Sequence, residues 1–330
     1  MRNLVDFGWL KQLISCLRVY IIGFMDVLSD VLRSSGMQAS LLTRNSFYKA
    51  WGLVFPCAKS VGFHIVTQGQ CWIRSPHLKA PIRLVRGDIA FLARGFDHEL
   101  ASDLEVKAVD VTAFQKVVAA AVRYEGDKAP LTTVVCGVYQ FEQPPMHPVF
   151  RELPPFIVIP ASEIPAHHPL HSALSLLSAE LAADDPRGRP GAEVVVNRLV
   201  DILFYYIFRH WIQTHEPRSG QSWALALKDE NLGLALAAMH REVARDWSVA
   251  DLARESHLSR AAFALRFKKL TGETPAHYLA RLRIERAMGM LKGTGRSLEE
   301  IAESVGYSNA FAFSKAFKRI QGLAPREFRR

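Results

Sequence analysis

The spacing of hydrophobic residues divides the chain into two parts. In the first part, short apolar runs alternate with Gly, Pro and charged residues that favour turns. The runs cover residues 51–55, 62–67, 70–74, 82–85, 89–93, 106–111 and 132–141. Short strands separated by turn residues are typical of a small β-barrel or sandwich. We therefore expect a β-barrel in the first half of the chain.

Helical spacing follows the barrel. Apolar residues repeat every three to four positions from Leu174 to Leu181 and again over 195–206, with a polar break at 184–191. The stretch HEPRSGQS at 215–222 is polar and contains Pro and Gly, which favours a linker. The predicted fold class is α+β, with an N-terminal β-barrel and its following helices before an all-α domain.

The all-α part contains an internal repeat, in which 248–278 resembles 297–328 element by element. Each copy begins with a Ser that is followed three positions later by a carboxylate. The pairs are Ser248 with Asp251 and Ser297 with Glu300. This spacing predicts a capping box, in which the two side chains satisfy free amides at the start of a helix. Each copy is therefore expected to open with a short helix, which carries Ala253 or Ala302.

A second helix follows in each copy, with Ser259 or Asn309 as its N-cap. Each of these helices carries two Phe residues at positions i and i+4, which lie on one face and are expected to be core. The four residues are Phe263, Phe267, Phe313 and Phe317. The small residue in the first helix lets the second cross it closely. This is the geometry of a helix-turn-helix unit, whose second helix enters the major groove of DNA.

Residues 276–292, between the two copies, are predicted to form a connecting helix. Its basic residues are expected to be available to solvent or phosphate: Arg281, Arg283, Arg286 and Lys292. A helix of this length spans roughly 25 Å. We expect it to hold the two recognition helices near one turn of DNA apart, so that they read successive major grooves on one face.

Composition and charge narrow the function. Hydrophobic residues make up 49% and charged residues 22% of the chain, as in a soluble globular protein. Residues 230–330 contain 18 Lys and Arg against 11 Asp and Glu, which is most of the net charge of +9. This excess indicates an anionic partner, either nucleic acid or an acidic membrane surface. The cysteines Cys16, Cys57, Cys71 and Cys136 show no CxxC spacing, which favours a cytoplasmic protein with reduced thiols.

The repeat resembles the AraC/XylS family of bacterial transcription regulators, over roughly 230–330. The matching residues are Ala253, GETPAHY at 272–278, RLR at 281–283, IA at 301–302, VGY at 305–307 and FSKAFK at 313–318. The N-terminal part resembles the cupin-like sensor domain of one branch of that family. Its matching residues are WGL at 51–53, FH at 63–64, GQCW at 69–72, GD at 87–88 and GFDH at 95–98.

The resemblance implies a division of the chain and a function. A cupin-like effector-binding and dimerisation domain is expected at 25–214, a linker at 215–228, and a double helix-turn-helix DNA-binding domain at 229–330. The implied function is a sequence-specific transcriptional regulator, controlled by a small-molecule effector. The implied partners are double-stranded DNA, RNA polymerase and a second copy of the chain. Whether the protein activates or represses stays open.

Outward positions in the N-terminal half of each recognition helix are expected to read bases. These candidates are Arg260, Ala261, Ala264, Leu265, Ala310, Phe311, Ser314 and Lys315. Arg can bind guanine through two hydrogen bonds, and Ala or Phe can contact a thymine methyl group. Further along the helices, Lys268, Lys269, Lys318 and Arg319 either contact phosphate or interact with the helix dipole. The family often has Arg where Leu265 stands, so the base preference of the first unit stays open.

In the cupin-like part, only His64 and His98 match the ligands of a cupin metal site, which needs three or four. We therefore expect no metal and no cofactor. Trp51, His64, Trp72 and His98 are candidates for an effector pocket. A second cluster, His167, His168 and His171, lies among prolines and is expected to be an exposed loop.

Residues 1–24 are apolar, but Asp6, Lys11 and Arg18 interrupt them, so no run approaches the ~20 apolar residues of a spanning helix. We expect no membrane partner. A cleaner helical pattern begins at Met25, and we interpret 1–24 as an extension upstream of the native start.

Two other functions fit parts of the sequence. A cupin-type oxygenase or isomerase with a DNA-binding tail would need a catalytic set, but the sequence shows no nucleotide-binding Gly loop, no GxSxG and no complete metal set. A membrane-surface protein would use 1–24 together with the basic C-terminal region. We favour a regulator that is not an enzyme, because two helix-turn-helix patterns occur in register on the basic end.

Overall fold

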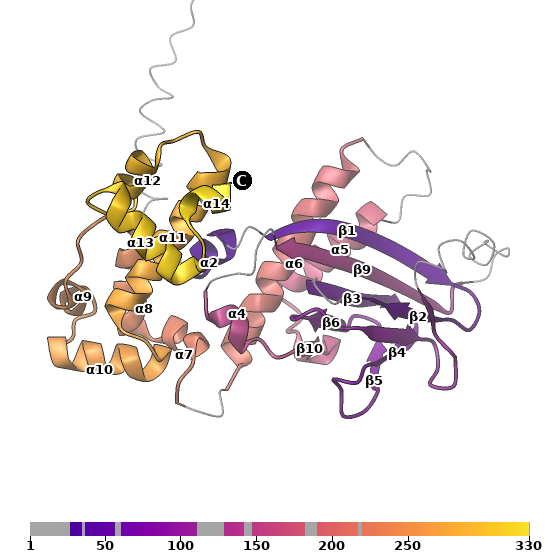
Figure 1. The fold of residues 1–330 in the computed structure, drawn as a ribbon. Coiled ribbons are helices and arrows are strands. Elements are labelled where there is room, and N and C mark those ends of the chain that lie inside the picture. The colour runs from indigo at the N-terminus through magenta and orange to yellow at the C-terminus, as the bar shows by residue number, and fades with distance from the viewer. Residues whose placement is uncertain are drawn as a thin grey trace, which may run out of the picture. The chain divides into compact units, whose positions relative to one another are not determined.

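Two compact units make up the structure, which is a computed structural model. It describes residues 27–34, 37–56, 61–110, 129–141, 147–181, 190–216 and 220–329. One unit is Ser35–Glu216, and the other combines Met1–Ser34 with Pro217–Arg330 (Figure 1). The expected division assigned residues 25–34 to the barrel domain, whereas their helix packs with the C-terminal helices. The proposed extension at 1–24 lies outside the described residues.

The first unit is built on two five-stranded sheets, drawn as arrows in Figure 1. In order across one sheet lie β1 (Met37–Phe47), β9 (Thr132–Phe141), β3 (Val61–Gln68), β6 (Ile89–Leu92) and β10 (Phe156–Ile159). Across the other lie β5 (Ile82–Val85), β4 (Gln70–Arg74), β7 (His98–Ala101), β2 (Gly52–Phe55) and β8 (Val109–Asp110). All neighbouring strands are antiparallel except β2 and β8.

The core of this unit follows from side-chain alternation along the strands. On β4, Cys71 and Ile73 are buried while Trp72, which points to the opposite face, is half-buried. Leu53 and Leu100 from the neighbouring strands join the same apolar cluster. Each predicted strand overlaps a strand of the structure, which adds β1, β7 and β10.

Of the predicted strand 106–111, the described residues form only β8, and the half-buried Arg74 holds the turn before it. The Arg74 guanidinium donates hydrogen bonds to the carbonyl oxygens of Leu104 and Val106, at 2.7 and 2.9 Å. Carbonyl groups that bind this side chain are not available to a strand ladder.

Helices α5 (Pro169–Leu181) and α6 (Ala192–Thr214) confirm the two helices expected after the barrel. The short α4 (Val149–Glu152) and a 3-10 turn (Ala161–Glu163) precede them. Phe204 of α6 packs on the sheet residues Phe91 and Tyr139, with ring centroids 5.7 and 5.1 Å apart. The expectation of a loop is wrong for His171, which lies in the first turn of α5 with its Nε2 3.2 Å from the Ile164 carbonyl oxygen.

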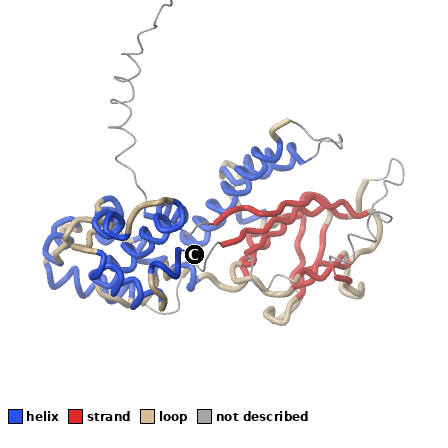
Figure 2. The backbone as a smooth tube through the Cα atoms, turned by 45° about the horizontal axis from the view of Figure 1, so that its top comes forward, coloured by secondary structure: helices blue, strands red, loops and turns tan. Residues whose placement is uncertain are grey.

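The second unit is all-helical, as Figure 2 shows in blue. Its helices are α2 (Val27–Ser34), α7 (Trp223–Lys228), α8 (Glu230–Arg241), α9 (Val249–Glu255), α10 (Arg260–Thr271), α11 (Pro275–Gly293), α12 (Leu298–Ser304), α13 (Ala310–Gln321) and α14 (Pro325–Arg329). Among the described residues, no helix has the length and apolar character needed to cross a membrane.

Two glycines of the helical unit differ in how closely other residues approach them. Gly306 and Gly322 both have positive φ, 83° and 84°. A Cβ at Gly306 would lie 2.5 Å from the Ala244 carbonyl oxygen, whereas one at Gly322 would meet nothing within 4 Å. Gly322→Ala should cost about 1 kcal/mol of unfolding free energy through backbone strain alone. Gly306→Ala should cost at least about 2 kcal/mol, because overpacking adds to the strain. Equal losses in urea unfolding would show that Ala244 does not constrain Gly306.

Candidate nucleic-acid interface and ligand pocket

The two predicted capping boxes are present and define where α9 and α12 begin. The Asp251 amide donates to Ser248 Oγ at 3.1 Å, and the Ser248 amide donates to the Asp251 carboxylate at 3.1 Å. Ser297 and Glu300 form the equivalent bonds at 3.2 and 2.7 Å. The hydrogen bonds from Ser248 lower the pKa of Asp251 to about 2, so this cap stays ionised near neutral pH.

The second helix of each unit is built in the same way. The Ala262 amide donates to Ser259 Oγ at 3.2 Å, and the Ala312 amide donates to Asn309 Oδ1 at 2.8 Å. The two Phe rings of each helix are fully buried and lie 5.7 Å apart on α10 and 5.6 Å apart on α13. Ala253 and Ala302, in the preceding helices, are also buried. Both predicted helix-turn-helix units are therefore present.

Helix α11 joins the two helix-turn-helix units and packs against α10, α12, α13 and α14. Its Arg283 donates to the carbonyl oxygens of Val243 and Arg245, at 3.0 and 2.8 Å. The same guanidinium lies 5.6 Å from the ring centroid of Tyr307, in the turn of the second unit. Arg283 thus ties the turn before α9 to the turn after α12.

The prediction that the basic residues of this helix are available to phosphate is wrong for three of the four. Arg283 is occupied as described, Arg281 pairs with Glu273 at 2.7 Å, and Arg286 pairs with Asp30. Lys292 alone is exposed, near the ring of Phe328. Of these partners only Glu273 lies within the repeat, and the local spacing of residues does not indicate which groups pair.

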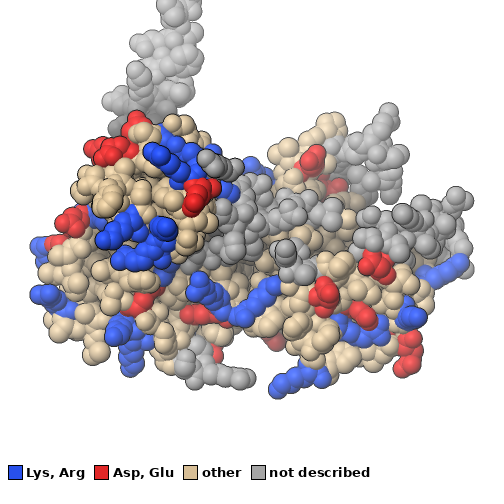
Figure 3. Space-filling view, in the orientation of Figure 1, with Lys and Arg blue, Asp and Glu red and all other residues tan. Residues whose placement is uncertain are grey.

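The candidate base-reading residues lie at exposed or half-buried positions of the two helices. Leu265 and Phe311 are 73% and 80% exposed, and large apolar side chains left so exposed often mark a contact surface. The remaining candidates are exposed (Arg260, Ala261 and Lys315) or half-buried (Ala264, Ala310 and Ser314). The phosphate candidates Lys268, Lys269, Lys318 and Arg319 are all exposed. Figure 3 shows Lys and Arg side chains over α13 and along α10.

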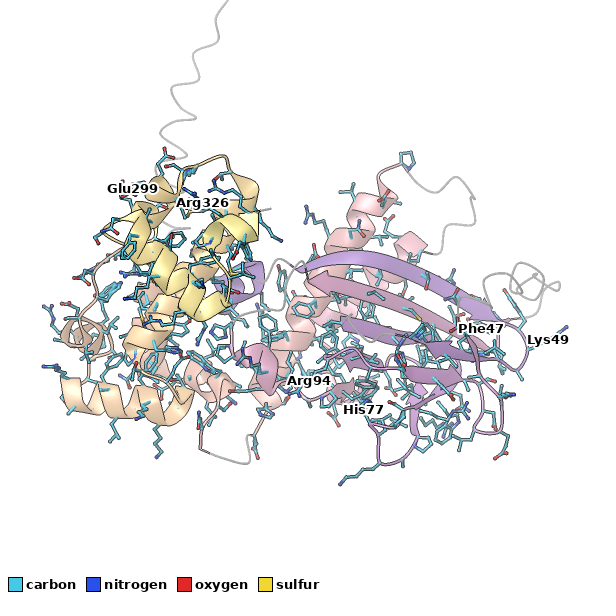
Figure 4. The ribbon with its side chains drawn as sticks, viewed as in Figure 1. Phe47, Lys49, His77, Arg94, Glu299 and Arg326 are labelled. Carbon is cyan, nitrogen blue, oxygen red and sulfur yellow. The ribbon has the colours of Figure 1, made fainter. Side chains whose placement is uncertain are left out.

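An acidic residue that sequence reasoning missed also helps to place α13. Glu299, labelled on α12 in Figure 4, accepts a hydrogen bond from the Ala310 amide at 3.0 Å. A carboxylate at this position interacts favourably with the helix dipole of α13. Glu299 thus fixes the start of the recognition helix from the preceding one.

The sheet-containing unit, Ser35–Glu216, contains a cavity of about 420 Å³. Its walls come from the end of β4, the loop between β4 and β5, and the start of β7. Apolar side chains such as Val54, Leu78 and Pro81 line it together with Lys79 and His98. His77, labelled in Figure 4, lies in the same loop, with its ring 4.7 Å from that of Phe96.

Behind the cavity, a chain of hydrogen bonds fixes the tautomers of two buried histidines. His98 Nδ1 lies 3.0 Å from the Phe96 carbonyl oxygen, which can only accept, so Nδ1 carries the proton. His98 Nε2 therefore accepts from His64 Nε2, at 2.7 Å. His64 Nδ1 in turn accepts from the Cys136 thiol, at 3.0 Å. Both rings are neutral in this arrangement.

These residues do not fit a cupin metal. The two Nε2 atoms face each other in a hydrogen bond, and Cys136 binds the other nitrogen of His64, so the three groups do not converge on one point. Within the described ranges, no group of three His, Cys, Asp or Glu side chains is placed to hold a metal ion.

The four candidate pocket residues lie at different depths. His98 lines the cavity, and His64 is one hydrogen bond behind it. Trp51 is buried in the core, stacked at 4.0 Å on Phe47, which Figure 4 labels. Trp72 is half-buried on the opposite face of β4.

Comparison with known proteins places this architecture in a family. A cupin family matches residues 26–213, and a helix-turn-helix domain family matches residues 252–330. A putative AraC-like transcription regulator of Streptomyces lividans is 32% identical over 313 residues, which are 93% of this chain and 98% of that protein. The chain belongs to the AraC family of transcription regulators.

Two further transcription regulators are similar, one over the same length and one over the DNA-binding part. An uncharacterized HTH-type transcriptional regulator of Haemophilus influenzae is 27% identical over 313 residues, 93% of this chain and 99% of that protein. The crystal structure of the DNA-binding domain of AdpA with a target DNA matches 31% of this chain and 91% of that domain, at 28% identity and a TM-score of 0.30. Family membership confirms the predicted fold class and a DNA-binding regulatory function.

The buried histidines of this AraC-family regulator make its stability depend on pH. Burial, with the nearby His98, lowers the pKa of His64 well below 6.5, and burial lowers that of His98 to about 4. In the unfolded chain both titrate near 6.5, so the unfolded state binds more protons as pH falls below that value. Stability should therefore be lost between pH 6.5 and about 4, with His98 contributing roughly 3 kcal/mol.

Urea unfolding at a series of pH values measures this effect. His98→Gln keeps an acceptor for His64 but removes one titrating ring, so its stability should fall less steeply over the same window. A wild-type stability that does not change between pH 7 and 5 would contradict the assignment.

Proposed function

We propose that the protein inserts α10 and α13 into successive major grooves on one face of a DNA duplex. The observation that carries this proposal is the matched build of the two helices: each has a capped start, a buried Phe pair beneath and an exposed N-terminal half. Helix α11, at 19 residues, is about 28 Å long, comparable with one turn of B-DNA.

Within this interface we assign two kinds of contact. Arg260, at the first position of α10, is exposed and forms no ion pair with any residue that the structure describes, which leaves its guanidinium available to a guanine. Phe311 and Leu265 present apolar surface suited to thymine methyl groups. Lys318 and its neighbours, in the last turns, contact phosphates, which position the protein without reading sequence.

Arg260→Ala and Lys318→Ala separate base reading from phosphate contact. Arg260→Ala should cost about 1–3 kcal/mol on the preferred duplex and relax specificity at one base position. Lys318→Ala should weaken binding to all sequences alike and reduce the salt slope by about one. Fluorescence anisotropy on a selected duplex and on single-base variants measures both. Equal effects of the two substitutions on random DNA would contradict the assignment.

We also propose that a small-molecule effector binds in the cavity beside His98. The volume of about 420 Å³ falls within the range of known ligand pockets, and apolar walls with a few polar groups are typical of such sites. Both ring nitrogens of His98 are already used in its hydrogen bonds to Phe96 and His64, so this ring contributes surface rather than a free acceptor. The charged groups of the lining are Arg74, Lys79, Asp97 and Glu99. This favours a mostly apolar molecule that carries a polar or charged group.

Filling the cavity tests this assignment. A ligand present at 100 times its Kd stabilises the folded state by about 2.7 kcal/mol, so a thermal-shift screen of metabolites detects it. Leu78→Trp should abolish the shift of any compound found. Val85→Trp, at an exposed position outside the cavity, should leave it unchanged. A compound that shifts the wild type and Leu78→Trp equally binds elsewhere and contradicts the proposal.

The protein is further proposed to act as a homodimer. Helices α5 and α6 carry exposed apolar residues that a second copy would cover: Leu176, Val194, Val195, Ile202 and Tyr205. Exposed large apolar side chains on neighbouring helices are often found where a partner binds.

We also propose that the protein regulates transcription. The protein would act in the cytoplasm of a bacterium, where the chromosome lies, and would contact RNA polymerase when bound beside a promoter. We propose no catalytic activity, because regulation accounts for both the DNA-binding unit and the cupin-like unit.

A further inference from the structure

The two recognition helices begin beside different side chains. Glu299, at the second position of α12, accepts a hydrogen bond at 3.0 Å from the amide of Ala310, the first residue of α13. Because the N-caps of α9 and α12 correspond in the repeat, Ala250 stands where α12 has Glu299. An Ala side chain accepts no hydrogen bond. The start of α13 therefore has a carboxylate that the start of α10 lacks at the matching position.

This carboxylate is anchored but keeps one free oxygen. Its Oε2 is bonded to the Ala310 amide, and the side chain is exposed. In the described part of the chain, Oε1 accepts no hydrogen bond, and no basic side chain forms an ion pair with Glu299. Phe311, which follows Ala310, is 80% exposed. A fixed carboxylate with an open oxygen thus lies beside residues assigned to base contact.

The charge of Glu299 decides which groups of DNA can approach it. The amides at a helix start usually attract phosphate, but a carboxylate already bound there repels a second anion. In the major groove, the guanine and thymine edges offer acceptors, whereas the amino groups of cytosine and adenine donate hydrogen bonds. A carboxylate that loses water without gaining a donor costs free energy. Glu299 therefore fits an amino group and disfavours the other base edges.

We propose that Glu299 is a specificity determinant of the second helix-turn-helix unit and accepts a hydrogen bond from the amino group of one cytosine or adenine. This inference rests on the proposed insertion of α13 into a major groove. Because the carboxylate repels phosphate, it contributes discrimination between sequences rather than affinity for all of them. In the first helix-turn-helix unit, Ala250 leaves the start of α10 without this charge, and Arg260 adds a positive one.

Base analogues that lack the amino group test this contact directly. In a duplex selected by the full-length wild type, each cytosine and adenine of the segment assigned to α13 is replaced in turn by 2-pyrimidinone or purine. Fluorescence anisotropy measures the Kd of wild type and Glu299→Ala for each duplex, so any effect of an analogue on the duplex itself is common to both proteins. At one position we expect the wild type to lose roughly tenfold in affinity and Glu299→Ala about twofold or less, because alanine accepts nothing.

Glu303→Ala is the matched control for this experiment. Glu303 is exposed on the same helix, and its side chain forms no hydrogen bond to α13 among the described residues. The control should keep the roughly tenfold loss of the wild type. Glu299→Ala itself should fold, because α10 forms with Ala250 at the matching position.

Two results would overturn the proposal. One is an equal loss for the wild type and Glu299→Ala at every replaced base, which would leave Glu299 as a positioning residue for α13 and nothing more. The other is a loss that Glu299→Ala relieves only in the segment assigned to α10, which would show that the contact does not lie where α13 binds.

Hydroxyl-radical footprints on the same duplex separate this proposal from the proposed function. If the wild type leaves the segment assigned to α13 unprotected, the insertion of α13 is wrong, and the role of Glu299 is overturned with it. If both segments are protected and the analogues affect wild type and Glu299→Ala equally, the insertion holds and only the role of Glu299 is overturned.

Glu299→Gln provides a second measurement should Glu299→Ala fail to fold. Its amide oxygen can still accept from the Ala310 amide, but a neutral acceptor binds an amino group less strongly than a carboxylate does. We expect the loss on the analogue to fall to about threefold. Random DNA should be bound about twofold more tightly, because the repulsion of phosphate is removed. A wild-type value of either quantity would overturn the proposal.

Discussion

Two recognition helices can act on one duplex only if a rigid element fixes their relation, and the packing of α11 supplies that constraint. This helix contacts α10 and α13 and carries Arg283, which ties the turn before α9 to the turn after α12. Gly306 allows the second turn to approach Ala244 closely. The two helix-turn-helix units are therefore held by one helix rather than by a flexible linker.

Each unit solves the same physical problem in the same way. A recognition helix must bury one face firmly and leave the other face free for DNA. Paired Phe rings on a buried Ala provide the buried face, and side-chain caps at both helix starts satisfy amides that would otherwise lack partners. Leu265 and Phe311 can then remain exposed, because the helices do not need them for stability.

Local signals in the sequence predicted most of this arrangement. Capping boxes, Phe spacing and turn residues act over a few positions, so the repeat could be recognised without a structure. The contacts that set the geometry act over long distances in the sequence: Arg283 binds carbonyl groups about 40 residues away, and Asp30 binds His240 from 210 residues away. Strand β1 was missed because it lies at a sheet edge, where its polar sequence MQASLLTRNSF shows no clean alternation. Strands β7 and β10 have only four residues each, which is too few for alternation of buried and exposed positions to be recognised in the sequence.

On our proposal, α10 and α13 occupy successive major grooves on one face of the same duplex. Hydroxyl-radical footprinting of the full-length protein, on a duplex that it selects from a random pool, measures how the two helices lie on DNA. We expect two protected segments whose centres lie about 10 base pairs apart on one face of the helix. A single protected segment, or two segments on opposite faces, would contradict it.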